Sequence, residues 1–320
     1  MKGALGFRRK LLDWYGRNAR DLPWRATRDP YRIWISEIML QQTRVAAVIP
    51  YYTRFLDRFP NVGSLARASE EDLLTAWSGL GYYARARNLH RAAQQIAARG
   101  VFPREYESLR RLPGVGEYTA AAIGSIAFGL PHAVVDGNVR RVLSRLACGA
   151  VEPAQLAEES LDRERPGEFN QALMELGATL CLPREPKCAA CPVASMCEAR
   201  RQGRQAEFPV RVPRPKTVRV ARTVLVAQRG GCVLLGLRAG FWELPEAEEL
   251  TGARLGERLG QFRHSITNHN YTVGVVEARV PRTPRGFAWV AEQDLGRMPL
   301  STMTRKALAL RERIKPDRGH

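Results

Sequence analysis

Four of the six cysteines of this chain fall within seventeen residues, and this cluster constrains the local fold more than any other feature of the sequence. The N-terminal segment lacks the uninterrupted apolar core of a secretion signal, so we expect a cytoplasmic, nucleoid-associated protein without disulfides. Four thiolates close in sequence are typical ligands of zinc or of an iron–sulfur cluster. Zinc sites more often pair two C-x2-C arms, and this C-x6-C-x2-C-x5-C pattern has one. The four residues are Cys181, Cys188, Cys191 and Cys197.

The chain is strongly basic. Its 320 residues include 50 Lys and Arg against 32 Asp and Glu, which gives a net charge of +18 and a pI of about 10.3. Cationic side chains at phosphates release condensed counterions, so this excess favours a polyanionic partner such as nucleic acid. No apolar run approaches the length that spans a bilayer, and no membrane association is expected.

Composition divides the chain into three parts. Residues 1–200 contain helix-length segments with periodic apolar positions and short turns between them. Residues 201–217 are rich in Arg and Pro and predict an exposed linker. The remainder predicts a smaller α+β domain. Its expected strands and closing helix lie at residues 218–228, 231–238, 271–280, 287–290 and 304–314.

Two glycines separate helix-like segments in LPGVGEYTAAAI, residues 112–123. Glycine permits a tight turn, and the amides at the start of the following helix favour an anion. An ordinary link between helices would show the same pattern. In so basic a chain, we expect Gly114, Val115 and Gly116 to contact DNA phosphate.

Two acidic residues stand out by their surroundings. Glu37 lies in IWISEIMLQQ, residues 33–42, where six of the first eight residues are apolar. A carboxylate loses hydration in such a segment, so it either lies at a solvated helix edge or serves chemistry there. Asp136 precedes a helix-like run in AVVDGNVRRVLSR, and we predict that it caps this helix. Capping keeps a carboxylate ionised and oriented, so the role is compatible with catalysis.

Together, the glycine turn, the downstream Asp and the cysteine cluster resemble the helix–hairpin–helix DNA glycosylases that carry an iron–sulfur cluster. Within these, the first 200 residues resemble the MutY-type adenine DNA glycosylases, and the last hundred resemble them more loosely. The segments that carry this resemblance are DLPWR (21–25), WISEIMLQQTRV (34–45), GLGYYARARNL (79–89), LPGVGEYTA (112–120), VDGNVRRV (135–142) and FNQALMELGATLC (169–181).

The resemblance implies a mainly α N-terminal helix–hairpin–helix glycosylase fold with an iron–sulfur cluster loop, plus a C-terminal α+β Nudix-like domain. In residue numbers, it implies a six-helix core at about 28–132 and a cluster subdomain from 1–27 and 133–200. The linker at 201–217 then leads to a Nudix-like lesion-recognition domain at 218–320. It also implies one [4Fe-4S] cluster on the four cysteines, with a structural role. The implied partner is double-stranded DNA containing adenine opposite 8-oxoguanine or guanine, bound by a monomer.

The resemblance also assigns catalytic residues. Glu37 would be the general acid that protonates adenine, since an apolar setting raises the pKa of a carboxyl. Asp136 would stabilise the sugar cation or trap it covalently, and sequence leaves both open. Asn138 and Tyr118 would support these two acids. Related bifunctional enzymes have a lysine where this chain has Tyr118, and a phenol cannot form the imine that allows strand cleavage. We therefore predict base removal that leaves an abasic site.

Flipping a base from the duplex leaves a gap in the stack. Gln42 and Tyr82 match family positions that insert near the lesion, although Tyr82 would also suit ordinary helix packing. Trp24, Arg25 and Gln171 match positions around the adenine pocket, although the first two would also suit bracing of the domain.

The last hundred residues contain GFWELPE (240–246), which resembles the strand and turn before a Nudix helix. The paired carboxylates of that helix are absent, so nucleotide hydrolysis is not predicted. Family members often carry a Phe-Ser-His loop for reading 8-oxoguanine, and Ile266, Thr267 and Asn268 align with it. Thr267 and Asn268 are the predicted lesion contacts. This chain departs from the family pattern by the loss of Phe, and a loop that serves only the fold is the alternative.

Two other functions are compatible with parts of this pattern. One is a thymine or uracil mismatch DNA glycosylase of the same superfamily, some of which also have Tyr in the turn. The other is a non-catalytic lesion-binding protein, which would keep the cysteines and the turn. The joint presence of Glu37 and Asp136 argues against the second function.

Overall fold

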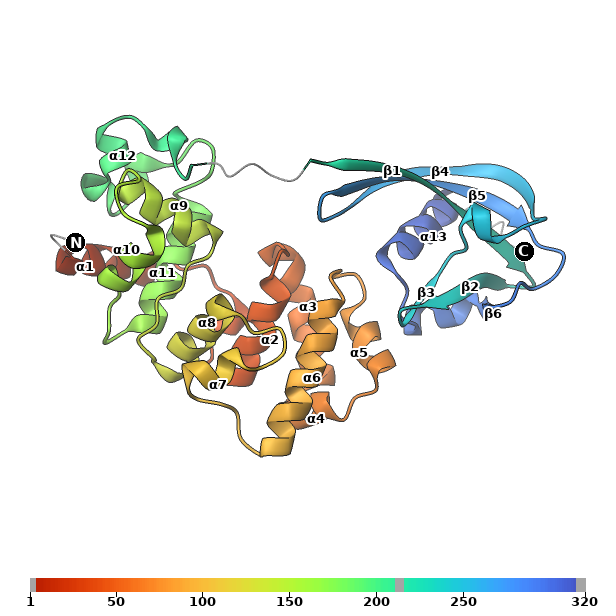
Figure 1. Cartoon of the computed structure of the whole chain (residues 1–320), viewed down its shortest axis with the longest axis horizontal. Coiled ribbons are helices and arrows are strands. Elements are labelled where there is room, and N and C mark those ends of the chain that lie inside the picture. The colour runs from red at the N-terminus through yellow and green to blue at the C-terminus, as the bar shows by residue number, and fades with distance from the viewer. Residues whose placement is uncertain (1–3, 211–215, 315–320) are drawn as a thin grey trace. The chain divides into compact units, whose positions relative to one another are not determined.

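The structure is a computed structural model that describes residues 4–210 and 216–314 (Figure 1). The described residues form two compact units. One consists of residues 4–67 and 88–210, and the other of residues 68–87 and 216–314. Residues 211–215 of the expected linker lie outside the described part. No helix of the described chain is long and apolar enough to cross a bilayer.

The first unit is helical and has two layers. The first layer is built around α2, which has apolar side chains on all sides and is therefore buried. Its helix starts because the Asp29 side chain accepts a hydrogen bond from the Tyr31 N–H at 2.9 Å and Pro30 takes the first turn. α2 packs on α3 and α8. The helices of this layer are α2 (Pro30–Leu40), α3 (Val45–Arg58), α4 (Val62–Ala66), α6 (Ala84–Arg99, from Asn88 onward), α7 (Tyr106–Arg110) and α8 (Glu117–Phe128), preceded by the short η1 (Pro23–Arg25).

The second layer joins the start of the chain to residues after 136. Its apolar core contains Phe7 and Leu11 from the first helix, with Leu143 and Phe169 from helices far along the sequence. Its helices are α1 (Ala4–Asn18), α9 (Gly137–Leu146), α10 (Pro153–Ser160), α11 (Pro166–Thr179) and α12 (Glu198–Arg201), with the short turns η2 (Cys188–Ala190), η3 (Ala194–Met196) and η4 (Gln205–Glu207). α11 packs on α1, α8 and α9 and so connects the two layers.

The second unit contains a mixed six-stranded sheet in the order β3-β2-β1-β5-β4, with β6 paired to β2. β1 and β5 are parallel, in register from Val218–His269 to Ala227–Ala278, and the other pairs are antiparallel. The strands are β1 (Val218–Arg229), β2 (Cys232–Arg238), β3 (Phe241–Glu243), β4 (Arg254–Ile266), β5 (His269–Arg279) and β6 (Phe287–Ala291). The α+β prediction for this region is confirmed.

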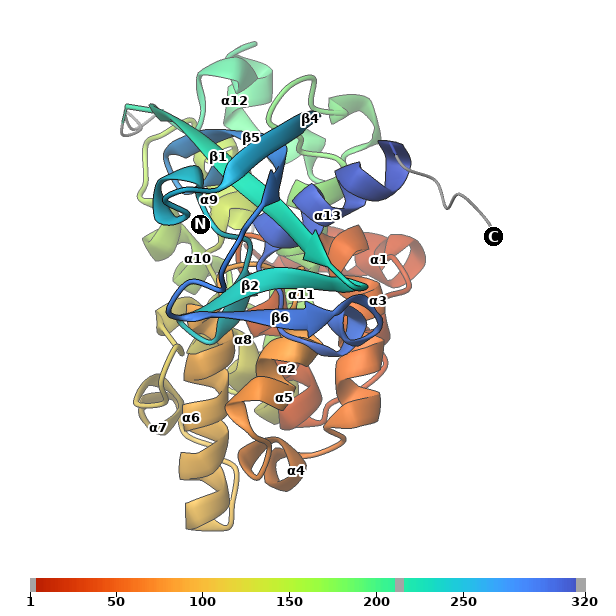
Figure 2. The ribbon, with the colours of Figure 1, turned by 90° about the vertical axis from the view of Figure 1, so that its right-hand side faces the viewer.

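Apolar side chains cover both faces of this sheet. On one face, Ala307 and Leu308 of α13 (Thr302–Ile314) pack in the core with Val273 and Val275. Figure 2 shows the helix α13 beside the sheet. On the other face, a smaller cluster includes Leu225, Leu234 and Leu250. The short element η5 (Ala247–Glu249) lies between β3 and β4, and η6 (Glu292–Arg297) lies between β6 and α13. The helix α5 (Glu70–Trp77) belongs to the same unit.

The sequence analysis assigned no element to residues 254–266, where the structure has β4. Register shifts between Leu255 and Gly260 interrupt the pairing with β5, and such bulges break the alternation that identifies a strand. The strand also lies at the sheet edge and is largely exposed, which further weakens its apolar pattern. Because this segment is a strand, it leaves no room here for an acidic helix.

Candidate active site

One cavity of about 210 Å³ in the first unit gathers seven of the residues singled out from the sequence. They come from η1, α2, α8, α9 with its preceding residue, and α11, so both layers contribute. These residues are Trp24, Arg25, Glu37, Tyr118, Asp136, Asn138 and Gln171. The volume suits a small planar group.

Glu37 points into this cavity from a helix that is buried on every side. Its exposed fraction is 5%, and its Oε2 atom has no hydrogen-bond partner among the described residues. Burial raises the pKa of Glu37 to about 7, a hydrogen bond with Tyr118 lowers it in part, and the charge of Asp136 raises it. At neutral pH the carboxyl therefore retains a proton in a large fraction of molecules.

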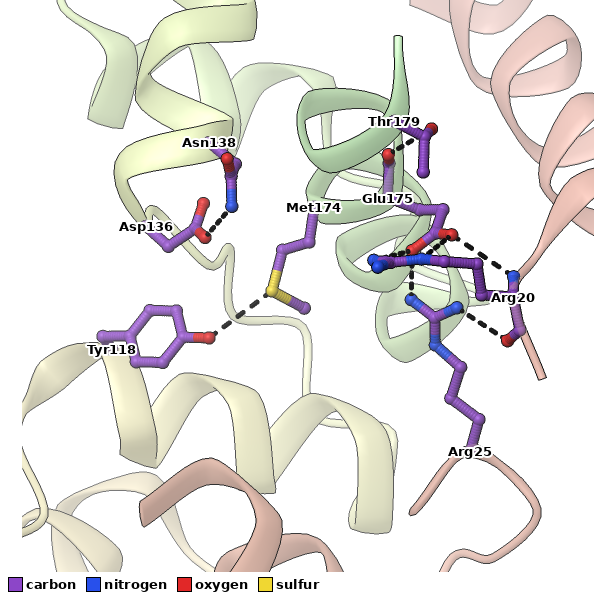
Figure 3. Close-up of polar contacts among 8 residues, drawn as sticks. All are labelled: Arg20, Arg25, Tyr118, Asp136, Asn138, Met174, Glu175 and Thr179. Carbon is purple, nitrogen blue, oxygen red and sulfur yellow. Dashed lines mark hydrogen bonds and ion pairs between the residues drawn. The ribbon is translucent and has the colours of Figure 1, made fainter. Parts of the chain in front are cut away.

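Tyr118 stands between the two acids. Its hydroxyl donates to the Met174 sulfur at 3.4 Å (Figure 3) and also neighbours the Glu37 carboxyl. A thioether is a weak acceptor, so we regard the carboxyl as the stronger competitor for this proton. Burial and the charges of Glu37 and Asp136 raise the pKa of Tyr118 well above its ordinary value. The phenol is therefore a neutral donor in the cavity.

Asp136 caps α9, as predicted. Its Oδ1 accepts from the Val139 N–H at 2.7 Å, and its Oδ2 accepts from the Asn138 Nδ2 at 2.9 Å (Figure 3). Two N–H donors therefore satisfy the two oxygens of this carboxyl group and fix its plane. Glu37 and Asp136 thus differ in surroundings: one has an unpartnered oxygen in an apolar helix, and the other has a donor on each oxygen.

The orientation of Asn138 depends in turn on Arg141, which is 9% exposed. The Arg141 Nη2 donates to the Asn138 Oδ1 and to the Gly177 carbonyl, both at 2.8 Å, and its Nε donates to the Cys181 carbonyl at 2.7 Å. A chain of hydrogen bonds therefore connects Asp136 to the first residue of the cysteine cluster. The sequence analysis did not identify Arg141, although it lies one helical turn after Asn138 on the same face.

The sequence analysis also did not identify Arg20 and Glu175, two further charged residues of the cavity. Glu175 lies one turn after Gln171 on α11, and its side chain is 0% exposed. Its carboxylate binds both Arg20 and Arg25 (Figure 3). The spacing of Gln171 and Glu175 placed them on one helix face, but nothing in the sequence pairs Glu175 with residues about 150 positions earlier.

The glycine turn lies outside the cavity, between α7 and α8. Gly114 has φ +77°, and a Cβ at this position would lie 2.8 Å from the Asn88 Cβ, so glycine is required. Val115 is buried, while Gly116 is exposed and caps α8 without a side-chain hydrogen bond. The first amides of α8 are thus available to an anion. Gln42 is exposed in the turn after α2, with φ +58°.

The four predicted metal ligands, Cys181, Cys188, Cys191 and Cys197, surround a small cavity of about 30 Å³. Arg145 Nη1 donates to the Cys181 Sγ at 3.3 Å, and Gln205 Nε2 donates to the Cys188 Sγ at 3.8 Å. Within the described ranges, no three His, Cys, Asp or Glu side chains are spaced to hold a single metal ion. The donor set itself, four sulfurs around one cavity with N–H donors at two of them, is compatible with the ligands of an iron–sulfur cluster.

The remaining predicted residues belong to the second unit. Tyr82 is 38% exposed with φ +50° and lines a cavity of about 460 Å³, which Ser265 and Ile266 also line. Thr267 and Asn268 form the turn between β4 and β5 and are exposed or half-buried beside this cavity rather than lining it. Thr267 has φ +53°, which is unusual for a β-branched residue.

The chain is similar to known proteins over most of its length. The family model described as "HhH-GPD superfamily base excision DNA repair protein" matches residues 35–164. The adenine DNA glycosylase of Mus musculus is 35% identical, over 96% of this chain and 78% of that protein. The Homo sapiens adenine DNA glycosylase is 47% identical over 63% of this chain, which spans only 41% of that protein. A solved structure of a thermostable thymine-DNA glycosylase is 31% identical, with a TM-score of 0.59, over 63% of this chain and 98% of that one.

The raised pKa of Glu37 predicts a contribution to stability that depends on pH. Since the pKa rises from 4.5 to about 7 on folding, this contribution is complete below pH 4.5 and is lost as pH rises through 7. At about 1.4 kcal/mol per pH unit, the loss is about 3 kcal/mol. We expect Glu37→Gln to gain stability relative to the unmodified protein between pH 5 and pH 8, measured by urea unfolding. Glu117→Gln, which changes an exposed side chain of α8, is the control. An equal pH dependence of the free energy of unfolding in all three proteins would contradict the raised pKa of Glu37.

Proposed function

This chain belongs to the adenine DNA glycosylase family, and we propose that it removes adenine mispaired with 8-oxoguanine or guanine in double-stranded DNA. One observation supports this proposal above the others. The buried Glu37 carboxyl, with its unpartnered oxygen, shares a cavity with Asp136, whose two oxygens are each hydrogen-bonded. An acid that donates a proton beside one that remains charged is the requirement for cleaving an N-glycosidic bond.

In the proposed reaction, Glu37 transfers its proton to the imidazole-side ring nitrogen of the flipped adenine. The bond between the sugar and adenine then breaks, its electron pair stays with the base, and adenine leaves neutral. Positive charge develops on the sugar, where the Asp136 carboxylate stabilises it or bonds to it. Water then adds to the sugar carbon and displaces the Asp136 carboxylate where the two have bonded, and the water proton passes to the Glu37 carboxylate. The product is an abasic site. General acid catalysis of this kind contributes about 10²–10⁴-fold to the rate.

The products should be adenine and an intact strand with an abasic site. Tyr118 occupies the position from which an amine would attack the sugar, and a neutral phenol forms no imine. Strand cleavage should therefore require alkali. A thymine or uracil mismatch glycosylase is the second candidate, favoured by the 31% identity to the thymine-DNA glycosylase structure.

The proposed DNA contacts use the charge and the turn of the first unit. The amides at the start of α8, beside Gly114, Val115 and Gly116, would receive a phosphate, and Gln42 would enter the stack. The net charge of +18 would strengthen binding by counterion release. We expect a nucleoid-associated enzyme that acts on DNA as a monomer.

We also propose that Cys181, Cys188, Cys191 and Cys197 hold one [4Fe-4S] cluster. The donors from Arg145 and Gln205 to two of these sulfurs support this assignment. The cluster would stabilise the loop that follows α11, and hydrolysis requires no electron from it.

Recognition of 8-oxoguanine would use the second unit. Tyr82 and Ile266 line its aromatic cavity, and Thr267 and Asn268 bring a hydroxyl and an amide to its edge. The Thr267 hydroxyl donates to the Ile266 carbonyl at 2.7 Å, so it would exchange this bond for one to the lesion.

Single-turnover excision on duplexes that carry A opposite 8-oxoguanine, A opposite G, or T or U opposite G tests the main proposal. We expect alkali-dependent cleavage at adenine, fastest opposite 8-oxoguanine. The rate should fall about tenfold per pH unit above pH 7, because only protonated Glu37 is active. Glu37→Gln should abolish excision while duplex binding persists. Excision of T or U instead would establish the second candidate, and turnover by Glu37→Gln would exclude Glu37 as the acid.

The cluster proposal predicts that Cys191→Ser is purified without the yellow-brown colour of the unmodified protein. Its melting temperature should also fall, since a loop built around four ligands loses one of them. The absorbance spectrum and thermal unfolding measure both effects. Cys232→Ser, a half-buried cysteine of the second unit, should keep the colour. A coloured and fully active Cys191→Ser protein would remove Cys191 from the ligand set.

The lesion-reading proposal predicts that Thr267→Ala lowers the preference for 8-oxoguanine over guanine by roughly two- to tenfold, the value of one hydrogen bond. The ratio of the two single-turnover rates measures this preference. Thr251→Ala, in an exposed turn of the same unit, should leave the ratio unchanged. An unchanged ratio for Thr267→Ala would indicate that this turn serves only the fold.

A further inference from the structure

The Glu175 carboxylate is the most heavily hydrogen-bonded acid of the active-site cavity. Its Oε1 accepts from the Arg20 Nε at 2.6 Å and from the Arg20 backbone N–H at 3.2 Å. Its Oε2 accepts from the Arg20 Nη2 at 2.8 Å and from the Arg25 Nη2 at 2.7 Å. Four donors from two arginines therefore converge on one buried acid (Figure 3).

Arg25 forms a hydrogen bond to Arg20 as well as to Glu175. The Arg25 Nη1 donates to the Arg20 carbonyl at 3.0 Å, and its guanidinium lies over the Tyr15 ring at 5.4 Å. Both terminal nitrogens of Arg25 thus have a partner, and its side chain is 14% exposed. These bonds fix the orientation of Arg25, which lines the cavity, and each terminal nitrogen carries a second N–H group.

Burial would raise the pKa of Glu175, but the hydrogen bonds and charges of Arg20 and Arg25 outweigh it and hold the pKa at about 2. The acid is therefore ionised throughout the range in which Glu37 titrates. The reaction described above uses Glu37 and Asp136 and has no step for Glu175. This charged, buried group in the same cavity as Glu37 and Asp136 needs another explanation.

We propose that Glu175 is a positioning residue, which orients Arg25 toward the flipped base and offsets the positive charge of the two arginines. This inference rests on the proposed function, because it assigns a role in adenine excision. Positive charge develops on the sugar as the base leaves, and two uncompensated guanidinium groups in the same cavity would oppose it. One shared carboxylate lets Arg25 serve as a hydrogen-bond donor to the base at a lower electrostatic cost.

The test compares Glu175→Gln, Arg25→Ala and the double variant in single-turnover excision of adenine opposite 8-oxoguanine. A displaced positioning group reduces chemistry by roughly 100-fold, and we expect this loss for Glu175→Gln. Binding to a duplex that carries a 2′-fluorinated, excision-resistant adenosine should change by less than about threefold, since this acid makes no contact with DNA phosphates. Glu168→Gln, an exposed acid on the same helix, is the matched control and should excise at the unmodified rate.

The double variant distinguishes positioning from a general loss of structure. If Glu175 acts through Arg25, the double variant should be no slower than Arg25→Ala, because removing one member of a unit already removes the effect of the other. A loss equal to the product of the two single losses would overturn the proposal, as would an unmodified rate in folded Glu175→Gln.

A second variant covers the case in which Glu175→Gln does not fold. Arg25→Lys keeps the positive charge at this position. An ammonium group lacks the planar fork with which Arg25 donates to Glu175 and to the Arg20 carbonyl at the same time, so we expect a comparable loss of rate. An unmodified rate in Arg25→Lys would overturn the proposal. If the unmodified protein itself excised no adenine, the proposed function would fail, and this outcome is distinct from a failure of Glu175 alone.

Discussion

The desolvation of one carboxyl, that of Glu37, is the constraint on which the remainder of the site depends. Its helix is apolar on all sides, so an ionised Glu37 would lose hydration without a full set of partners. The protein accepts this cost, and the result is an acid whose pKa is raised to about 7. Any polar group added near the free oxygen would stabilise the anion and weaken the acid. The apolar neighbours of Glu37 are therefore as necessary for its chemistry as the carboxyl itself.

The other two carboxyl groups of the cavity, in contrast, accept hydrogen bonds on both oxygens. Asp136 receives one donor on each oxygen, and Glu175 receives two on each. Three acids thus lie in one cavity with three degrees of hydrogen bonding, and their proposed roles follow from that difference: a proton donor, a stabiliser of positive charge and a positioning group. Residue type alone would not distinguish them.

Part of the site could be predicted from local sequence. Asp136 precedes an apolar periodic run and therefore caps a helix, and Gly114, outside the cavity, allows a backbone conformation that a Cβ would block. Other cavity residues, such as Trp24, Arg25 and Gln171, were expected only from the family resemblance. The ion pairs of Glu175 with Arg20 and Arg25 could not be predicted, since these partners lie about 150 residues earlier in the chain. An Arg in such a segment is compatible with many partners. β4 was missed for another reason: its bulge and its exposed edge position remove the alternation by which strands are recognised.

The orientation of the Asp136 carboxylate depends on residues that do not line the cavity. Asn138 can orient the Asp136 carboxylate only while Arg141 holds its amide oxygen, and Arg141 is itself anchored on the carbonyls of Gly177 and Cys181. The helices α9 and α11 approach each other closely here, as shown by the 2.6 Å that would separate a Cβ at Gly177 from the Asn138 Cβ. A shift of the backbone at Cys181 would therefore pass through three hydrogen bonds to the Asp136 carboxylate in the cavity. This connection gives the cysteine loop a structural reason to be rigid that requires no electron transfer.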